Sequence, residues 1–300
     1  MSVRLGVDLG GTKIAAVILG EDGGVLWEAR VPTPQGDYDG IVRAVTDMVT
    51  QGETAVGATV SVGIGIPGAA SRATGLVKNA NSTCLIGRPF QADLSASLNR
   101  QVRLANDANC LAISEATDGA AAGASVVFGV ILGTGTGGGL VIDGRVIEGA
   151  NAIAGEWGHN PLPWSGDDER PGPACYCGRS GCIETWLSGP GLARSYAAAG
   201  GDAMRSEEVV VRATGGESLA DGVLGRWEER LARSLATVIN VVDPDVIVVG
   251  GGLSAIERLY ERVPSLWAPW VFSDTVRTRL RRAQYGDASG VRGAAWLWPR

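Results

Sequence analysis

The sequence has little positive charge and no long apolar stretch. Its 26 Lys and Arg residues are outnumbered by 32 Asp and Glu residues, and they form no basic run. Nucleic acid is therefore not expected as a partner, because binding to a phosphate backbone needs a positive field. No stretch approaches the roughly 18 consecutive apolar residues of a membrane helix. No basic leader with a cleavage site precedes the apolar run at Val3, so we expect a soluble, cytoplasmic protein without a membrane partner.

The sequence also lacks the common nucleotide-binding motifs. The P-loop pattern G-x-x-x-x-G-K-[ST] does not occur. The segment from Gly133 to Gly139 reads GTGTGGG and formally contains the dinucleotide pattern G-x-G-x-x-G. That pattern requires a helix directly after the glycines, whereas residues 140–144 are typical of another strand and turn. A P-loop enzyme and a nicotinamide-dependent dehydrogenase are therefore both disfavoured.

One pattern of strands and glycine turns occurs twice. The 300 residues, 45% of them hydrophobic, suffice for two domains. The expected elements are strands at 5–9, 14–19, 25–31, 60–66 and 102–104 with helices at 39–51, 92–98 and 108–122, followed by strands at 126–132, 140–142, 146–147 and 246–249 with a helix at 219–242. Two facing copies of such a unit form a cleft with a glycine turn from each half at its floor. We predict an α/β protein with domains at 1–118 and 119–289, and a last helix at 290–300 that packs back on the first domain.

Three glycine clusters have the features of a nucleotide site. In DLGGTK, from Asp8 to Lys13, two glycines expose backbone N–H groups where a strand doubles back. An acidic residue beside phosphates needs a cation, so Asp8 is predicted to hold Mg²⁺ between itself and the β- and γ-phosphates. An ordinary hairpin turn is the alternative for this segment. The predicted ATP and magnesium site consists of Asp8, Gly10, Gly11, Thr12, Lys13, Gly133, Thr134, Gly135, Thr136, Gly137, Gly138, Gly250, Gly251 and Gly252, the last three beside the adenosine.

Asn106 and Asp107 lie between a predicted strand and the helix that follows it, where loops deliver chemistry in α/β folds. Phosphoryl transfer to a hydroxyl needs a carboxylate that accepts the proton of the attacking group, and Asp107 is the candidate for that base. Asn106 would then hold the molecule that carries this hydroxyl. The alternative is that Asp107 is the N-cap of the helix, which is a common role for Asp at such a position.

The single histidine lies near three of the five cysteines. His159, Cys175, Cys177 and Cys182 fall within 24 positions, a grouping that favours a Cys₃His zinc site. A disulfide is disfavoured, because cytoplasmic proteins rarely keep them and Cys-x-Cys is poor geometry for a bridge. Four protein ligands leave no open position, so the zinc would be structural and would fix the loop that carries Glu156 and Glu184. Those carboxylates are predicted to accept hydrogen bonds from sugar hydroxyls, with solvated surface glutamates as the alternative.

In order and spacing, these motifs resemble the ROK (repressor, open reading frame, kinase) family of sugar kinases. The matching segments are 8–13, 106–107, 132–139, 155–159 and 175–184. The resemblance implies a duplicated actin-like (ribonuclease H-like) fold with an interdomain cleft, an MgATP-dependent kinase reaction, and Asp107 as its base. It also implies a sugar site made of Gly68, Asn106, Asp107, Glu156, His159 and Glu184, with His159 shared between sugar and zinc.

Within the family, the sequence is most similar to bacterial fructokinases that also accept mannose. The similarity lies in NANST at 79–83, AGEWGHNPLPW at 154–164 and SGVRGAAWLWP at 289–299, and it implies phosphorylation of the 6-hydroxyl of fructose. The GTGTGGG turn is equally similar to N-acetylglucosamine kinases, so that sugar and glucose remain alternatives. A catalytically silent sugar sensor and an actin-like structural ATPase are further alternatives. Family members are commonly dimers, so we expect a homodimer.

Overall fold

The computed structural model describes residues 3–80 and 82–298, so Asn81 and Pro299 of the motifs above lie outside the described residues. The chain packs into two compact units. The first contains the residues up to Gly123, residues 139–154 and the residues from Gln284 onward, and the second contains residues 124–138 and 155–283. The boundary predicted between residues 118 and 119 stays a prediction.

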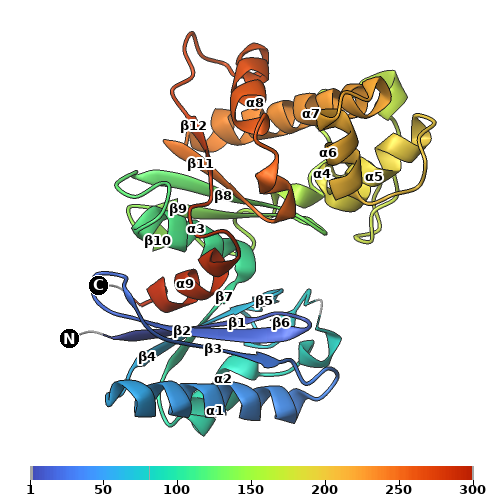
Figure 1. Ribbon diagram of the computed structural model, residues 1–300. Helices are drawn as coiled ribbons and strands as arrows, with labels where there is room; N and C mark the ends of the chain where they lie inside the picture. Colours follow the sequence, from blue (N-terminus) through green and yellow to red (C-terminus); the bar gives the residue numbers. More distant parts are fainter. Residues whose placement is uncertain (1–2, 81, 299–300) are drawn as a thin grey trace. The chain divides into compact units, whose positions relative to one another are not determined.

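The first unit is built on a five-stranded mixed sheet with helices on both faces (Figure 1). The strand order is β3 (Val25–Pro32), β2 (Lys13–Leu19), β1 (Arg4–Leu9), β4 (Ser61–Ile66), β7 (Val102–Asn106). The helices α1 (Tyr38–Val56) and α2 (Phe90–Ser97) cover one face, and α3 (Asp107–Thr117) and α9 (Ser289–Trp296) cover the other. The strands β1, β4 and β7 run parallel, so their carboxyl ends meet at one edge of the sheet.

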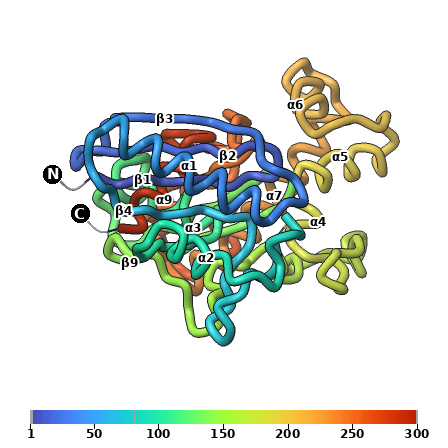
Figure 2. Tube along the Cα trace, turned by 90° about the horizontal axis from the view of Figure 1, so that it is seen from below, coloured from blue at the N-terminus to red at the C-terminus, as the bar shows by residue number. Residues whose placement is uncertain are grey.

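The two faces of this sheet are packed in different ways. On one face, α1 packs against β3, β2 and β1 (Figure 2) and buries Ile41, Val45 and Met48 against the sheet. On the other face, α9 contacts the sheet backbone itself. A Cβ at Gly6 in β1 would collide with the Val291 carbonyl oxygen, and one at Gly63 in β4 would collide with that of Ala294. The glycines therefore allow the C-terminal helix to lie directly on β1 and β4.

The second sheet has the strand order β10 (Arg145–Val146), β9 (Thr136–Ile142), β8 (Val126–Leu132), β11 (Val246–Gly250), β12 (Arg279–Arg282). If the strands of each sheet are numbered in the order in which they occur along the chain, both sheets have the spatial order 3-2-1-4-5. This shared order confirms the predicted duplication of an α/β unit. Helices of the second unit include α4 (Ile183–Leu187), α5 (Gly189–Ala198), α6 (Ser206–Thr214), α7 (Ser218–Val242) and α8 (Leu259–Trp267). The helices α5 and α6 pack side by side (Figure 2), and both contact α7.

Some local predictions were wrong. The helix predicted at 108–122 is α3, which ends at Thr117. The loop predicted at 133–139 is shorter, because β9 begins at Thr136 and takes in the last glycines. A Cβ at Gly138 would lie 2.7 Å from the Gly155 carbonyl oxygen and 2.8 Å from the Phe128 ring, so that glycine serves strand packing. In the part of the chain that the structure describes, no helix is both long enough and apolar enough to cross a membrane.

Candidate active site

Two carboxylates, Asp8 and Asp107, lie at the same edge of the first sheet. Asp8 is level with Gly65 in β4, and Gly65 is level with Ala105 in β7, so Asp107 lies two residues beyond the level of Asp8. A Cβ at Gly65 would lie 3.1 Å from Cys110 Sγ, so this glycine makes room for α3 on β4. The strands β1 and β7 thus bring two of the predicted site residues into one place.

The pKa of Asp8 is raised from its ordinary 3.8 to about 6. Burial is the largest cause, and the negative charge of Asp107 is the next, while Lys13 acts in the opposite direction. Asp287, which lies just before α9, adds to the rise. Ionising Asp8 is therefore costly unless a cation compensates for the two negative charges. A hard divalent ion such as Mg²⁺, which prefers carboxylate and water ligands, fits this pair of carboxylates.

The N-cap of α3 is Asn106, not Asp107. Asn106 has an extended backbone conformation, and its side-chain oxygen accepts a hydrogen bond from the Ala108 N–H at 2.8 Å. Asp107 is the first residue inside the helix, and its Oδ1 accepts from the same N–H at 2.8 Å. Asn106 therefore meets the need for an N-cap oxygen. The alternative that Asp107 is present only as a cap loses its main support.

The first glycine turn is tight and exposed. The Gly10 N–H donates to the Lys13 carbonyl oxygen at 3.0 Å, and the Thr33 hydroxyl donates to the Gly10 carbonyl oxygen at 2.8 Å. Gly11, Thr12 and Lys13 are exposed, and a Cβ at Gly11 would meet nothing within 4 Å. This open turn directly follows the strand that carries Asp8, so an anion can approach its backbone beside the carboxylate.

Gly68 has a local structural role. Its φ of 141° lies in a region that glycine favours, and a Cβ there would lie 2.8 Å from the Lys78 carbonyl oxygen and 2.9 Å from Ala80 Cα. It precedes the small hairpin of β5 (Ala69–Ala70) and β6 (Val77–Lys78). Gly68 therefore shapes this loop of the first unit, whatever the loop binds.

In the second unit, Glu184 is bound to the second glycine turn. Its Oε2 accepts a hydrogen bond from the Thr136 N–H at 2.9 Å, and it lies 2.6 Å from where a Cβ of Gly135 would be. Glu184 is in the first turn of α4, two residues after Cys182. It is thus not a solvated surface glutamate, and it connects the cysteine loop to the turn. Trp157 makes a second connection, since its indole N–H donates to the Gly137 carbonyl oxygen at 2.9 Å.

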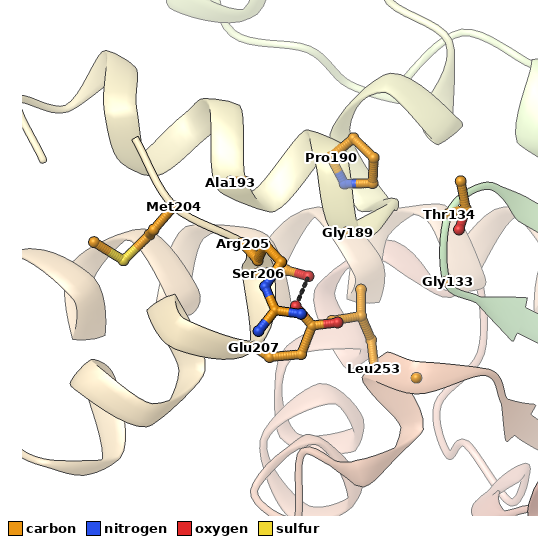
Figure 3. A pocket seen from close by; sticks show the side chains of 11 residues that line it. Gly133, Thr134, Gly189, Pro190, Ala193, Met204, Arg205, Ser206, Glu207 and Leu253 are labelled. Atoms are coloured by element: carbon orange, nitrogen blue, oxygen red, sulfur yellow. Dashed lines mark hydrogen bonds between the residues drawn. The ribbon is translucent and has the colours of Figure 1, made fainter. Parts of the chain in front are cut away.

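A pocket of about 430 Å³ opens next to this turn (Figure 3). Figure 3 shows four chain segments around it, and these supply Gly133, Thr134, Gly189, Pro190, Ala193, Met204, Arg205, Ser206, Glu207, Gly252 and Leu253. Three of the predicted nucleotide residues, Gly133, Thr134 and Gly252, therefore line one cavity. Gly250 is the last residue of β11. The next residue, Gly251, has a φ of 81°, and a Cβ there would lie only 2.5 Å from the Leu132 carbonyl oxygen.

Most of the lining of this pocket was not predicted from the sequence. The residues from 189 to 207 belong to the start of α5 and to the segment that enters α6. The available signal is Ser188-Gly189-Pro190-Gly191, where Ser188 is an N-cap that accepts from the Gly191 N–H at 3.2 Å. The Gly189 N–H donates to the Gly133 carbonyl oxygen at 2.7 Å, so the start of α5 is tied to the second glycine turn.

The four predicted zinc ligands do come together. The candidate donor atoms of His159, Cys175, Cys177 and Cys182 all lie within 4.8 Å of one another. The sulfurs of Cys177 and Cys182 are 3.6 Å apart, and Cys175 Sγ is 3.6 Å from His159 Nδ1. Tetrahedral Zn²⁺ with its usual bond lengths has S–S edges of about 3.8 Å and S–N edges of about 3.6 Å. The donor set and its spacing therefore fit zinc.

The thiols of this cluster differ in acidity. The Arg179 backbone N–H, as the largest cause, lowers the pKa of Cys177 to about 7, and burial raises the pKa of Cys182. The separation of 3.6 Å between their sulfurs is far above a disulfide bond of about 2.05 Å. A bound Zn²⁺ takes its cysteine ligands as thiolates, and Cys177 is already near that state at neutral pH.

His159 has a second partner, which the sequence did not reveal. Its Nε2 is 2.9 Å from the Tyr176 hydroxyl, and the two rings meet edge to face with centroids 5.1 Å apart. Nδ1, which faces Cys175, is therefore the nitrogen available to a metal, and Nε2 is turned toward exposed side chains. Glu156, the other predicted sugar residue of this loop, is exposed just before the turn of 3₁₀-helix at Trp157–His159.

Comparison with known proteins identifies relatives over nearly the whole chain. The family model described as "ROK family" matches residues 4–300. An N-acetyl-D-glucosamine kinase of Pectobacterium atrosepticum is 40% identical over 296 residues, which cover 97% of each protein. A solved ROK hexokinase from Thermus thermophilus has a TM-score of 0.88 and 31% identity, with 98% of this chain and 97% of that one covered.

A further solved structure was determined with ligands. It is a ROK family glucokinase from Streptomyces griseus in complex with glucose and AMPPNP, with a TM-score of 0.78 and 28% identity. The similarity covers 99% of each chain. The fold is therefore the α/β two-domain fold of ROK sugar kinases, as the sequence predicts.

The raised pKa of Asp8 makes its charge a cost to the fold. Because the folded state binds this proton more tightly than the unfolded state, the free energy of unfolding falls as pH rises from about 4 to about 6. We expect Asp8→Asn to raise the free energy of unfolding at neutral pH by up to about 3 kcal/mol in the absence of divalent cations. Urea unfolding over a pH series measures this, and the gain should shrink as pH falls through 6. A variant less stable than wild type at neutral pH would contradict the assignment.

The cysteine cluster predicts the metal content of the purified protein. We expect about one zinc per chain, and Cys182→Ser should lose most of it and lower the melting temperature, because a structural zinc contributes directly to folding. Cys84→Ser is the matched control, since Cys84 is a free thiol outside the cluster. Elemental analysis with thermal unfolding measures both effects. Wild-type protein without zinc, or Cys182→Ser protein with a full complement, would refute the site.

Proposed function

The chain belongs to the ROK family of sugar kinases, and on that premise we propose that it is an ATP-dependent N-acetyl-D-glucosamine kinase acting on the 6-hydroxyl. The support for this sugar is the 40% identity to an enzyme of that name over 97% of both proteins. The observation that carries the kinase chemistry is the paired Asp8 and Asp107 beside an open glycine turn. A catalytically silent sensor has no need for such a costly pair of charges.

The sequence alone favours fructose, with mannose as a second substrate, and this preference lacks support. The relatives described above are named for N-acetyl-D-glucosamine, hexose and glucose. The GTGTGGG turn, which resembles N-acetylglucosamine kinases as much as fructokinases, agrees with the first of these. We therefore take N-acetylglucosamine as the substrate in place of fructose.

Each residue of the site has a proposed role in phosphoryl transfer. Asp107 accepts the proton of the attacking 6-hydroxyl, and Asn106 hydrogen-bonds the sugar. Asp8 holds the magnesium of MgATP through its carboxylate, and magnesium supplies neutralisation of phosphate charge. The backbone of the turn at Gly10–Lys13 binds phosphate oxygens. Gly68, Glu156, His159 and Glu184 are proposed to complete the sugar site, as the family resemblance implies.

The pocket at Gly133, Thr134 and Gly252 is proposed to take the nucleotide. Its volume of about 430 Å³ lies in the range of small-molecule sites, and the glycines let a ligand approach the backbone closely. Arg205, whose Nε donates to Glu208 Oε1 at 3.2 Å, brings a positive charge to the wall of this pocket, and Glu207 brings a negative one. The remaining residues proposed for ATP, Gly135 to Gly138 and Gly250 to Gly251, then act by shaping this wall.

Zinc is proposed to hold the sugar-binding residues in place. His159, Cys175, Cys177 and Cys182 are the proposed ligands, and Glu184 follows Cys182 in the first turn of α4. When bound, zinc supplies a rigid cross-link and no reaction chemistry, because its four positions are filled by protein. The Glu184 bond to Thr136 would transmit this rigidity to the second glycine turn.

Removing the proposed base tests the mechanism. Asp107→Asn keeps the size and shape of the side chain but cannot accept the proton, so we expect kcat to fall by roughly 10²–10⁴ with little change in the KM for the sugar. A coupled assay of ADP release measures this. Asp47→Asn, an exposed carboxylate on α1, is the matched control and should retain wild-type turnover. Near wild-type kcat in Asp107→Asn would exclude the assigned role.

A panel of sugars tests the substrate. We expect kcat/KM to be highest for N-acetylglucosamine among N-acetylglucosamine, glucose, mannose and fructose, since a site that hydrogen-bonds an acetamide discriminates against sugars that lack it. The same ADP-release assay ranks the four. A highest value for fructose would restore the preference inferred from the sequence. Sugar binding without any ADP release would indicate the sensor instead.

A further inference from the structure

Glu115 is a fully buried carboxylate that the mechanism above does not use. It lies on α3, about two turns after Asp107, and its exposed fraction is 0%. Its Oε2 accepts hydrogen bonds from the Ala120 N–H at 2.8 Å and the Gln284 N–H at 2.9 Å. Its Oε1 accepts from the Tyr285 N–H at 3.3 Å and the Ser289 hydroxyl at 2.8 Å. All four donors are neutral, so the side chain serves as a hub of acceptors and not as half of an ion pair.

The four donors come from the residues just after α3 and from the residues that lead into α9. Ala120 lies just after α3, shortly before the chain leaves this unit at Gly123. Gln284 and Tyr285 are the first residues after the chain returns, and Ser289 begins α9. One carboxylate therefore ties α3 to the entry of α9. The two helices are already in backbone contact, since a Cβ at Gly293 would collide with the Cys110 carbonyl oxygen.

The entry of α9 lies beside Asp8. A Cβ at Gly290, the residue after Ser289, would be 3.5 Å from the Asp8 carboxylate carbon. The charge of Asp287, two residues before Ser289, also acts on Asp8. The segment from 284 to 290 is thus held by Glu115 at one side and borders Asp8 at the other. Glu115 and Asp107 lie on the same helix, α3. The hydrogen bonds of Glu115 hold the backbone segment that borders Asp8.

We propose that Glu115 is a positioning residue, which fixes the start of α9 against Asp8 and so sets the geometry of the cation site relative to Asp107. The inference rests on the proposed kinase function. Site residues displaced by about 1 Å can lose up to about a hundredfold in rate. A side chain that aligns the helix bearing the base with the backbone next to the metal ligand therefore has a large effect without touching substrate.

A carboxylate is specifically required at this position. Each oxygen of Glu115 accepts two hydrogen bonds, so an isosteric glutamine places its NH₂ group against two donors in either orientation. The Ser289 hydroxyl can turn to accept, but the Tyr285 N–H cannot. Glu115→Gln therefore keeps the volume and forces the start of α9 to move.

Asp118 provides a matched control. Its Oδ2 accepts from Arg292 at 2.5 Å, with both side chains nearly buried, so this pair also ties α3 to α9. Arg292 also donates to the Gly23 carbonyl oxygen in the turn between β2 and β3. That turn is at the opposite end of the sheet from Asp8, because Arg4, not Asp8, pairs with Leu19. Arg292 also lies over the Tyr285 ring, 3.9 Å from its centroid. Asp118→Asn leaves the backbone bonds from Gln284 and Tyr285 to Glu115 in place, so it should weaken the packing of the helices without moving the cation site.

The experiment compares Glu115→Gln, Asp118→Asn and wild type by thermal unfolding and by Mg²⁺ titration of kinase activity at saturating sugar. We expect both variants to melt at lower temperature. Only Glu115→Gln should raise the Mg²⁺ concentration for half-maximal activity, by about tenfold, and lower kcat by at least as much, with Asp118→Asn within twofold of wild type. Equal Mg²⁺ requirements in the two variants, or a wild-type requirement in Glu115→Gln, would overturn the proposal.

Two further measurements keep the outcome decisive. If Glu115→Gln does not fold, Ser289→Ala removes one donor and leaves the carboxylate. This variant should raise the Mg²⁺ requirement about two- to threefold, and an unchanged requirement overturns the proposal.

If the wild type phosphorylates no sugar, the proposed function fails on its own. The ATP affinity of each variant can then be measured by calorimetry with and without Mg²⁺. If Mg²⁺ increases the ATP affinity of wild type and Asp118→Asn but not of Glu115→Gln, the positioning role is supported; an equal increase in all three overturns it.

Discussion

The burial of Asp8 beside a second carboxylate, Asp107, is the constraint on which the first unit depends. Parallel strands carry both carboxylates to one sheet edge, and burial with the neighbouring charge raises the pKa of Asp8 to about 6. A fold selected only for stability would not keep two such groups together. Helix α9, which lies on glycines of β1 and β4, packs its first residues beside Asp8, and Glu115 anchors that end of the helix. In the proposed function, a cation held by Asp8 against a phosphate would convert this cost into binding affinity.

In the second unit, a chain of short contacts links the proposed metal to the nucleotide pocket. The cysteine cluster leads to Cys182 and then to Glu184, which bonds to Thr136. The turn from Gly133 to Gly135 continues to the pocket wall, where the Gly133 carbonyl oxygen accepts from Gly189. A zinc with four protein ligands takes no part in the reaction, yet its loss would loosen both the loop proposed to bind the sugar and the pocket wall proposed to receive ATP. In this proposal, the metal is a structural support for the residues that would set specificity.

The sequence predicted what short motifs can encode. Asp8 with its glycine turn, the Cys₃His grouping and the repeated strand pattern are local signals, and the strand order, the cluster and the family agree with them. The pocket lining at 189–207 escaped prediction because helices distant in sequence supply ordinary residues there. The sequence did not reveal that Asn106, and not Asp107, is the N-cap of α3, because this depends on the exact residue at which the helix begins. Sugar preference depends on hydrogen-bond directions, which spacing does not reveal.

A crystal structure of the enzyme with N-acetylglucosamine and the magnesium complex of a non-hydrolysable ATP analogue would test most directly whether the paired carboxylates do the chemistry. We predict the 6-hydroxyl within hydrogen-bond distance of the Asp107 carboxylate, and the magnesium held by Asp8 directly or through its water ligands. A 6-hydroxyl directed at another side chain, or a magnesium with no link to Asp8, would contradict this account.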